Sequence, residues 1–315
     1  MGLLSSRWLK VGISLALLVL LFRSTNLRAL TGQILTARID FFLLAFIGYL
    51  AGQMLSAYKW LLLAQPLGFF RPPRTFVVYY FAGMYLNLFA PSTIVGDLGR
   101  GLLLAERKEN LGRALQSVLA DRISGGVMLI WVSAGGFLLF GPTILPSTLC
   151  YGTIAIALFS VVGWWLLPRV VARYVSPQHR LHHAIMRVVA PYQTQTPLLV
   201  RASALALVFH LFQLGLLMIL ARALGFTLPL WYLILFVPLI TILSLLPFSF
   251  SGIGVREGGY VFFLALIGIG RDEALALGLL WSAVVLGAGL VGGVVLLLSP
   301  EARLSFAHIK KMKDE

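Results

Sequence analysis

Long uninterrupted apolar runs dominate this chain and limit what it can fold into. The runs at residues 41–64, 114–140 and 274–299 contain few charges, and each reaches the roughly 20 residues that a helix needs to cross a bilayer. Hydrocarbon offers no partner to a free backbone N–H or C=O group, so a spanning segment must be a helix or part of a closed barrel. Because the runs are continuous rather than alternating, the sequence predicts an all-α, polytopic membrane helix bundle.

The charge balance agrees with this assignment. Only 11% of the residues are charged and 59% are hydrophobic, yet the formal net charge is +14. In a membrane protein, an excess of Lys and Arg is typical of loops that follow the positive-inside rule and contact anionic lipid. We therefore expect membrane lipids, and no nucleic acid, as partners. The single cysteine, Cys150, excludes an internal disulfide.

The order of the apolar runs predicts about eight spans. The short apolar segment at 8–22 is not followed by a small-residue cleavage site, so we expect it to remain as a first helix. The other expected helices are 41–64, 75–95, 114–140, 149–167, 201–222, 231–246, 259–270 and 274–299.

The basic segment at 168–200 constrains how these helices cross the membrane. It carries four arginines, and their spacing favours a helix on the membrane surface. If every run crossed from a cytoplasmic N-terminus, this segment would lie outside, against the positive-inside rule. We therefore expect 75–95, or the polar stretch 96–113 after it, to enter and leave on the same side. Both termini and the loop 168–200 then lie in the cytoplasm, with the chain in the inner (cytoplasmic) membrane.

A proline, a glycine and an arginine recur with the same spacing in two places. The two copies are Pro91, Gly96, Arg100 and Pro247, Gly252, Arg256. Helix-breaking residues beside ionisable ones, at matching places in two halves of a membrane protein, indicate a binding site built from broken helices. We expect one membrane domain, residues 1–315, with broken or re-entrant helices and a weak internal repeat whose halves are approximately 41–140 and 200–298.

The polar side chains and glycines beside these breaks are the candidate site. A charge at the bilayer centre costs about 2.5–3.5 kcal/mol, so each is expected to face protein, water or a charge of the other copy. The alternative is that they lie at the membrane surface, at helix ends. Arginine suits bidentate binding of a phosphate, and glycine lets a headgroup approach the backbone. The predicted substrate-binding residues are Asn87, Asp97, Arg100, Asp121, Arg122, Arg256 and Glu257, and the glycines predicted to allow backbone approach are Gly96, Gly252, Gly254 and Gly258.

The pair Asp121 and Arg122 has two competing interpretations, and the histidines have structural ones. Asp121 and Arg122 lie ~10 Å inside the run 114–140 by helical rise, where a place in the same cavity or an ion pair with the preceding loop would relieve the charge cost. His210 is interpreted as a hydrogen-bonded interior histidine, and the three histidines of the basic segment as solvated surface residues. We therefore expect no metal, no cofactor and no catalytic residue.

Together these motifs resemble the membrane domain of the lysylphosphatidylglycerol synthetase/flippase family. The resemblance covers about residues 5–300 and is carried by segments 87–100, 114–125 and 246–258. It implies a bundle with re-entrant elements that flips a lipid between leaflets or, in relatives, takes part in handling hopanoids, polyprenyl-linked sugars or other envelope lipids.

Two features of this chain depart from the family pattern. The first motif of the family often has Gly-Gly-Asp, whereas this chain has Val95-Gly96-Asp97, which leaves the backbone beside the proposed site less free. Members that make aminoacylated lipid carry a soluble transferase domain after the membrane part, and this chain stops at Glu315. The resemblance therefore implies no synthetase activity for this chain alone.

Three functions fit the sequence. We favour a flippase or flippase-like transporter of an anionic or polyprenyl-type envelope lipid, in which Arg100, Arg122 and Arg256 hold the headgroup. A membrane-embedded transferase acting on a lipid headgroup would use Asp97 or Glu257 as a base. A non-transporting partner of an envelope-lipid biosynthetic enzyme would bind through the loop 168–200.

Overall fold

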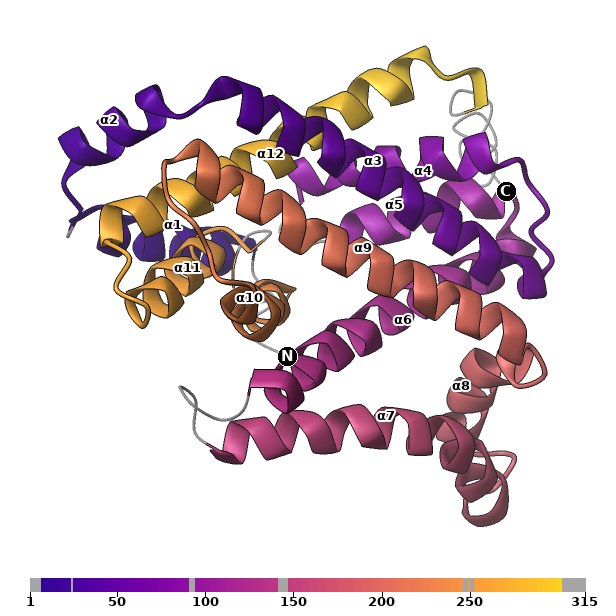
Figure 1. Cartoon of the computed structure of the whole chain (residues 1–315). Helices are drawn as coiled ribbons and strands as arrows, with labels where there is room; N and C mark the ends of the chain where they lie inside the picture. The colour runs from indigo at the N-terminus through magenta and orange to yellow at the C-terminus, as the bar shows by residue number, and fades with distance from the viewer. Residues whose placement is uncertain are drawn as a thin grey trace.

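The computed structural model describes residues 7–23, 25–90, 94–140, 147–245, 249 and 252–301. Within these residues the chain forms α-helices and short 3₁₀ turns and no strand, which confirms the all-α prediction (Figure 1). The helices are α1 (Arg7–Arg23), α2 (Leu27–Thr36), α3 (Ile39–Ala64), α4 (Pro73–Leu88), α5 (Ile94–Ala105), α6 (Lys108–Phe140), α7 (Ser147–Tyr174), α8 (Arg180–Val189), α9 (Thr196–Ala223), α10 (Leu230–Leu245), α11 (Val255–Ala265) and α12 (Arg271–Leu298).

Five of the described helices are long and apolar enough to cross a bilayer, namely α3, α6, α7, α9 and α12. A sixth span results if α1 and α2, which are bent by 95° relative to each other, count as one. The predicted number of about eight spans is not confirmed. The reason is that α4 and α10 have only 16 residues each, and such a helix extends about 24 Å, less than the ~30 Å of a hydrocarbon core.

Each of these 16-residue helices leads into a second short helix that runs back beside it. Gly83 of α4 lies opposite Arg100 of α5, and Ile240 of α10 lies opposite Gly259 of α11. Contacts between residues so far apart in sequence require the chain to reverse between the helices. We call α4–α5 the first hairpin and α10–α11 the second hairpin. Pro91 and Pro247, which the sequence places at the breaks, lie outside the described residues.

The polar stretch predicted at 96–113 is mostly helical, which corrects the sequence analysis. α5 extends to Ala105, and α6 begins at Lys108. The glycines of this stretch disfavour a helix by propensity, but close packing requires them: a Cβ on Gly96 would overlap the carbonyl oxygen of Gly83. Tertiary contacts therefore override local preference. A short helical hairpin is the form that a re-entrant element takes, and re-entry itself stays a prediction.

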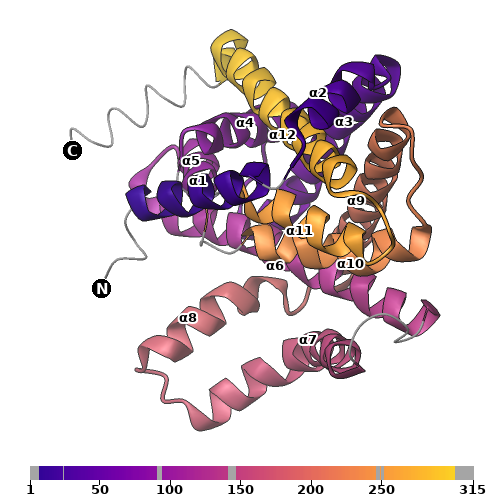
Figure 2. The same ribbon diagram turned by 90° about the vertical axis from the view of Figure 1, so that its left-hand side faces the viewer.

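The two halves of the bundle pack against each other in a reciprocal pattern. α3 packs against α9, α4 against α12, and α6 against α10 (Figures 1 and 2). In α3, Gly48 and Gly52 make room for the side chain of Phe212 from α9. Two copies of one unit related by a two-fold axis would produce this pattern. The repeat and its boundaries at 41–140 and 200–298 stay a prediction.

Glycines make the contact between α4 and α12 possible, and this contact yields a first testable prediction. A Cβ on Gly292 would overlap the backbone carbonyl of Phe81, so Gly292→Ala is expected to push α12 away from α4. Overpacking of this kind costs about 1–3 kcal/mol, measurable as a lower unfolding midpoint in detergent. Gly215→Ala is the matched control, because no atom lies within 4 Å of its Cβ position. An equal loss of stability in both variants would contradict the proposed packing role.

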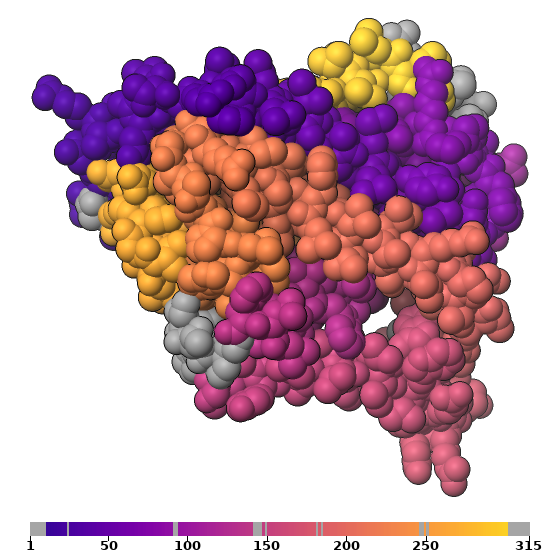
Figure 3. Space-filling model, in the orientation of Figure 1, coloured from indigo at the N-terminus to yellow at the C-terminus, as the bar shows by residue number. Residues whose placement is uncertain are grey.

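α7 and α8 form an arm beside the bundle, and Figure 3 shows a hollow between this arm and α9. The helix end expected at residue 167 is wrong, because Pro168 lies inside α7. Membrane helices tolerate an internal proline when neighbouring groups satisfy the freed backbone groups. The segment forms the helix α8, whose place on the membrane surface stays a prediction. The side-chain amide of Gln116 in α6 donates a hydrogen bond to the carbonyl of Arg187. This contact attaches α8 to the bundle.

Candidate functional site

Asp97 lies in the first turn of α5 and accepts hydrogen bonds from two arginines. Arg122 of α6 approaches it with two donors on one edge of its guanidinium group, with Nε 2.7 Å from Oδ2 and Nη2 2.9 Å from Oδ1. Arg100, one turn further along α5, donates from Nε to Oδ1 at 3.2 Å. A two-point arginine–carboxylate contact is among the stronger polar contacts in proteins. Asp97 therefore attaches the first hairpin to α6.

Asp121 of α6 is the centre of a buried ion network. Its carboxylate lies 2.9 Å from Nη2 of Arg100 and 3.0 Å from Nζ of Lys59, and none of the three side chains is more than 7% exposed. The guanidinium carbon of Arg100 also lies 4.9 Å from the ring centroids of Trp60 and Tyr80, a cation–π arrangement. Charges so deeply buried persist only when they are paired. The network therefore joins α3, α5 and α6.

Asn87 and Gly96 connect the two helices of the first hairpin. The backbone N–H of Gly96 donates to Oδ1 of Asn87 at 2.8 Å. This side-chain acceptor satisfies a backbone donor in the first turn of α5, where no intrahelical partner exists. The glycine at this position lets α4 and α5 approach closely, because any Cβ there would overlap Gly83. Its immediate structural role is therefore contact between the helices.

The second hairpin holds Arg256 and Glu257 at the start of α11. The preceding turn places Gly252 and Gly254 at φ values of 81° and 85°, a region that glycine enters without strain. The N–H of Gly254 donates to Oε2 of Glu257 at 2.6 Å. Ser282 of α12 donates to the other carboxylate oxygen and accepts a hydrogen bond from Nη1 of Arg256 at 3.1 Å. Ser282 therefore links both ionisable side chains to α12.

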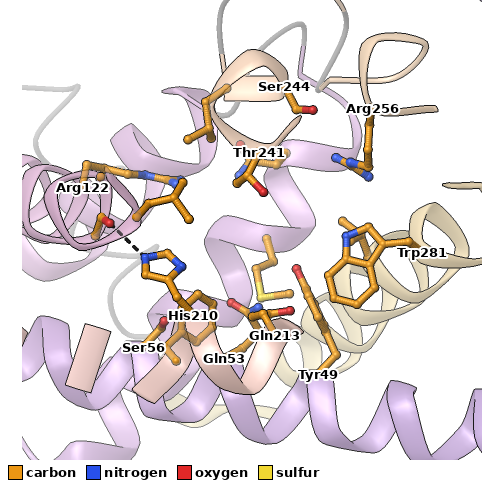
Figure 4. Close-up of a pocket in the computed structure, with 18 of the residues that line it drawn as sticks. Tyr49, Gln53, Ser56, Arg122, His210, Gln213, Thr241, Ser244, Arg256 and Trp281 are labelled. Carbon is orange, nitrogen blue, oxygen red and sulfur yellow. Dashed lines mark hydrogen bonds between the residues drawn. The ribbon is translucent and has the colours of Figure 1, made fainter. Parts of the chain in front are cut away.

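Residues from both hairpins line one cavity of about 370 Å³. Figure 4 shows Arg122 and Arg256 on opposite sides of it, with Tyr49, Gln53 and Gln213 along the wall built from α3 and α9. The cavity has a mixed polar and apolar lining, within a bundle whose outer helices expose many large apolar side chains. It is therefore a mostly apolar pocket that contains a set of charged and polar side chains, inside a protein with a largely apolar surface.

The structure brings most of the predicted site residues together. Those that line the cavity are Asn87, Gly96, Asp97, Arg100, Asp121, Arg122 and Arg256. Among the described residues, those predicted but absent from the lining are Gly252, Gly254, Glu257 and Gly258. A Cβ on Gly254 would meet Leu17 of α1, so this glycine faces another helix and not a headgroup. The binding roles of the lining residues stay a prediction.

Sequence reasoning missed several side chains that line the cavity. Lys59 carried a detectable signal, because a lysine near the end of the apolar run 41–64 is itself an expensive charge in a membrane. The uncharged polar residues carried none, because such residues are common in packed membrane helices. They include Gln53, Ser56, Gln213, Thr241 and Ser244.

His210 matches the prediction from the sequence, whereas His182, predicted to be a solvated surface residue, is partly buried and lies 3.1 Å from the carbonyl oxygen of Val175. Nε2 of His210 lies 2.9 Å from the carbonyl oxygen of Gly125, drawn as a dashed line in Figure 4, which confirms a hydrogen-bonded interior histidine. Within the ranges that the structure describes, no three His, Cys, Asp or Glu side chains are grouped so that they could hold a metal ion.

The fold and the cavity together define a multi-pass helical membrane protein whose two short hairpins contribute charged side chains to one pocket. A family model described as the lysylphosphatidylglycerol synthase TM region matches residues 7–293. The chain belongs to this family, which confirms the resemblance seen in the sequence and links the protein to lipid metabolism or flipping. Comparison with curated proteins and with solved structures finds no match.

Proposed function

We propose that this protein moves an anionic or polyprenyl-type envelope lipid between the leaflets of the inner (cytoplasmic) membrane, with both of its termini in the cytoplasm. The observation that carries the proposal is the placement of Arg100, Arg122 and Arg256 on one cavity. Ionisable residues inside a membrane bundle are expensive and mark substrate pathways. Arginine is the residue type that suits phosphate best, because its planar guanidinium group offers two parallel donors.

The size of the cavity supports a headgroup as the bound part. Its volume of about 370 Å³ lies at the lower end of the ~300–1,000 Å³ found for small-molecule sites. A headgroup fits such a volume while the acyl or prenyl tails stay in the bilayer. Large apolar side chains exposed on α7, such as Phe159 and Trp165, provide a surface that lipid tails can contact.

The first hairpin provides an element that can respond to a headgroup. Asp97 accepts two hydrogen bonds from the guanidinium of Arg122, as a phosphate could. A headgroup that binds Arg122 competes with Asp97 and loosens the attachment of the hairpin to α6. Binding then favours a state in which one half of the bundle has moved against the other, as in transporters that rock around a central site.

The other two functions have weaker support from the site. As a base in a transferase, Asp97 is already held by two arginines, and Glu257 accepts hydrogen bonds from Gly254 and Ser282. Incubation of the protein with candidate donors and lipids separates these functions, because a transferase changes the mass of the lipid and a flippase changes only its position. A non-transporting partner of an envelope-lipid enzyme would show neither change.

A leaflet-exchange measurement tests the proposed function. The purified full chain is reconstituted into vesicles that contain a trace of phosphatidylglycerol labelled on an acyl chain, and a membrane-impermeant quencher is added outside. We expect label in the inner leaflet to become accessible faster than in protein-free vesicles. Vesicles that hold an unrelated multi-pass protein control for general bilayer disturbance. Equal rates in all three preparations would refute lipid movement by this chain.

A further inference from the structure

The arm formed by α7 and α8 carries positive charge that nothing nearby in the chain offsets. Its four arginines, all exposed, are Arg169, Arg173, Arg180 and Arg187. The sequence contains no Asp or Glu between residues 122 and 256. Among the described residues, none of the four arginines takes part in a salt bridge. The arm therefore presents a basic surface that is available to an anionic partner.

The length of α7 places two of these arginines at the level of the lipid headgroups. Residues 147–168 carry no charge and extend ~33 Å as a helix, close to the ~30 Å of a hydrocarbon core. Arg169 follows directly, and Arg173 lies ~6 Å further along the helix axis. The headgroup region of each leaflet is about 5–7 Å thick. With α7 across the bilayer, both arginines therefore lie among the lipid phosphates.

Exposed aromatic and apolar side chains on the same part of α7 favour a membrane over an acidic protein as the partner. Trp165 and Val170 are each 46% exposed, and Tyr174 is 76% exposed. Trp and Tyr are enriched at the membrane–water interface, where their rings lie at headgroup level. A lipid surface offers phosphates to the arginines and hydrocarbon to these side chains. An acidic protein surface would match only the charges.

α8 presents its two arginines on one side. Arg180 and Arg187 are seven residues apart, which places them on the same face of the helix, and both are exposed. Val188 and Val189 are partly or fully buried. The apolar face of α8 is thus used for packing within the protein. Its basic face remains free to contact headgroups beside those that α7 reaches.

Hydrogen bonds at the end of α8 fix the arm to the bundle. Gln116 of α6 donates to the carbonyl of Arg187. The hydroxyl of Tyr192, in the turn that follows α8, donates to the carbonyl oxygen of Leu63 in α3 at 2.7 Å. The arm is therefore attached to α6 and α3 and projects beside the bundle at one end (Figure 2). This attachment holds the basic surface at a constant depth.

From these observations we propose that the arm is a second lipid-binding surface, separate from the cavity, that gathers anionic phospholipids of the adjacent leaflet. The four guanidinium groups contact lipid phosphates, and Trp165 and Tyr174 lie between the headgroups. None of the four arginines lines the cavity. The inference does not rest on the proposed function, because it concerns lipid that stays in its leaflet.

Quenching by spin-labelled lipids tests the composition of the membrane beside the arm. The full chain with Gln178→Cys, an exposed position in the turn between α7 and α8, is labelled with a fluorescent dye and placed in phosphatidylcholine nanodiscs. Cys150 is buried, and the unmodified chain treated with the dye gives the background. A trace of spin-labelled phosphatidylglycerol or of spin-labelled phosphatidylcholine is then included.

The labelled phosphatidylglycerol should quench the dye more strongly than the labelled phosphatidylcholine. We expect its apparent association with the arm to be about fivefold tighter, since one arginine near an anionic surface contributes about that factor. The preference should largely disappear in 1 M salt, where the Debye length falls to about 3 Å. This comparison of lipids needs no arginine variant.

A pair of double variants locates the effect on the arm. Arg173→Gln with Arg180→Gln, the arginines nearest the dye, should reduce the preference to less than about twofold. Arg28→Gln with Arg222→Gln is the matched control, because it removes two exposed arginines that lie outside the arm. The control should keep the full preference.

Three results would overturn the inference. Equal quenching by the two spin-labelled lipids would show that the arm gathers no anionic lipid. A preference that survives loss of Arg173 and Arg180 would place the bound lipid elsewhere on the protein. Equal quenching by the lipids, together with a change in the dye when an acidic peptide is added, would assign the surface to a protein partner instead.

Discussion

Arg256→Ala is expected to slow protein-mediated lipid exchange by about tenfold to a hundredfold. The guanidinium of Arg256 lines the cavity opposite Arg122 (Figure 4), and a hydrogen bond to a charged group contributes about 1.5–3 kcal/mol. Each 1.4 kcal/mol corresponds to about a factor of ten. The loss should appear as a slower approach to the final fluorescence level in the vesicle assay, at equal protein content.

The control for this variant removes the same side chain from a different place. Arg222 is exposed at the end of α9 and does not line the cavity, so Arg222→Ala should exchange lipid at the unmodified rate. Arg256→Lys extends the comparison, because it keeps the charge and removes the planar fork, and we expect an intermediate rate. Full activity in Arg256→Ala would show that this arginine does not bind the headgroup.

The long helices could be predicted from the sequence because each one is marked by its own apolar run. The run 201–222 is predominantly apolar, and α9, at Thr196–Ala223, contains all of it. The short helix α5 could not be predicted, because Gly96, Gly99 and Gly101 locally favour a loop. Their helical conformation depends on close packing against α4 and α6, which the sequence does not show. The span count is not confirmed for a related reason. Whether α4 crosses the membrane depends on where the chain turns after it, and no local pattern records that.

The candidate site was predicted in outline because charges in apolar runs are conspicuous. Asp121 and Arg122 were recognised as a single unit, whereas the structure gives them different partners, Arg100 and Lys59 for the first and Asp97 for the second. Neighbouring residues on a helix point in different directions, so one pair of charges serves two separate contacts. Which distant residue completes each contact follows from tertiary packing.

The buried network around Asp121 gives the second large expected effect. Asp121→Asn removes the one carboxylate that lies between Lys59 and Arg100, and leaves two buried cations beside a neutral amide. Removing one partner of a buried ion pair typically costs about 3–5 kcal/mol. We expect the unfolding midpoint of the protein in detergent to fall accordingly, together with the yield of folded protein.

An exposed pair provides the matched control for Asp121→Asn. Asp40 lies 2.6 Å from Arg38, a shorter contact than either one made by Asp121, but both side chains are more than half exposed. Because exposed pairs are screened by water and salt, Asp40→Asn should leave the unfolding midpoint nearly unchanged. If contact distance determined the effect, Asp40→Asn would be the more destabilising variant. If burial determines it, as we expect, Asp121→Asn is the more destabilising one.

A double variant separates the loss of charge balance from the loss of packing. Lys59→Met together with Asp121→Asn removes one buried cation with the carboxylate and leaves Arg100 its contact with Asp97. If unpaired charge causes the instability, the double variant should be more stable than Asp121→Asn alone, a coupling that a double-mutant cycle measures directly. If the stability losses of the single variants simply add, Asp121 stabilises α6 through packing. The ionic connection between α3, α5 and α6 would then contribute little to holding the first hairpin in place.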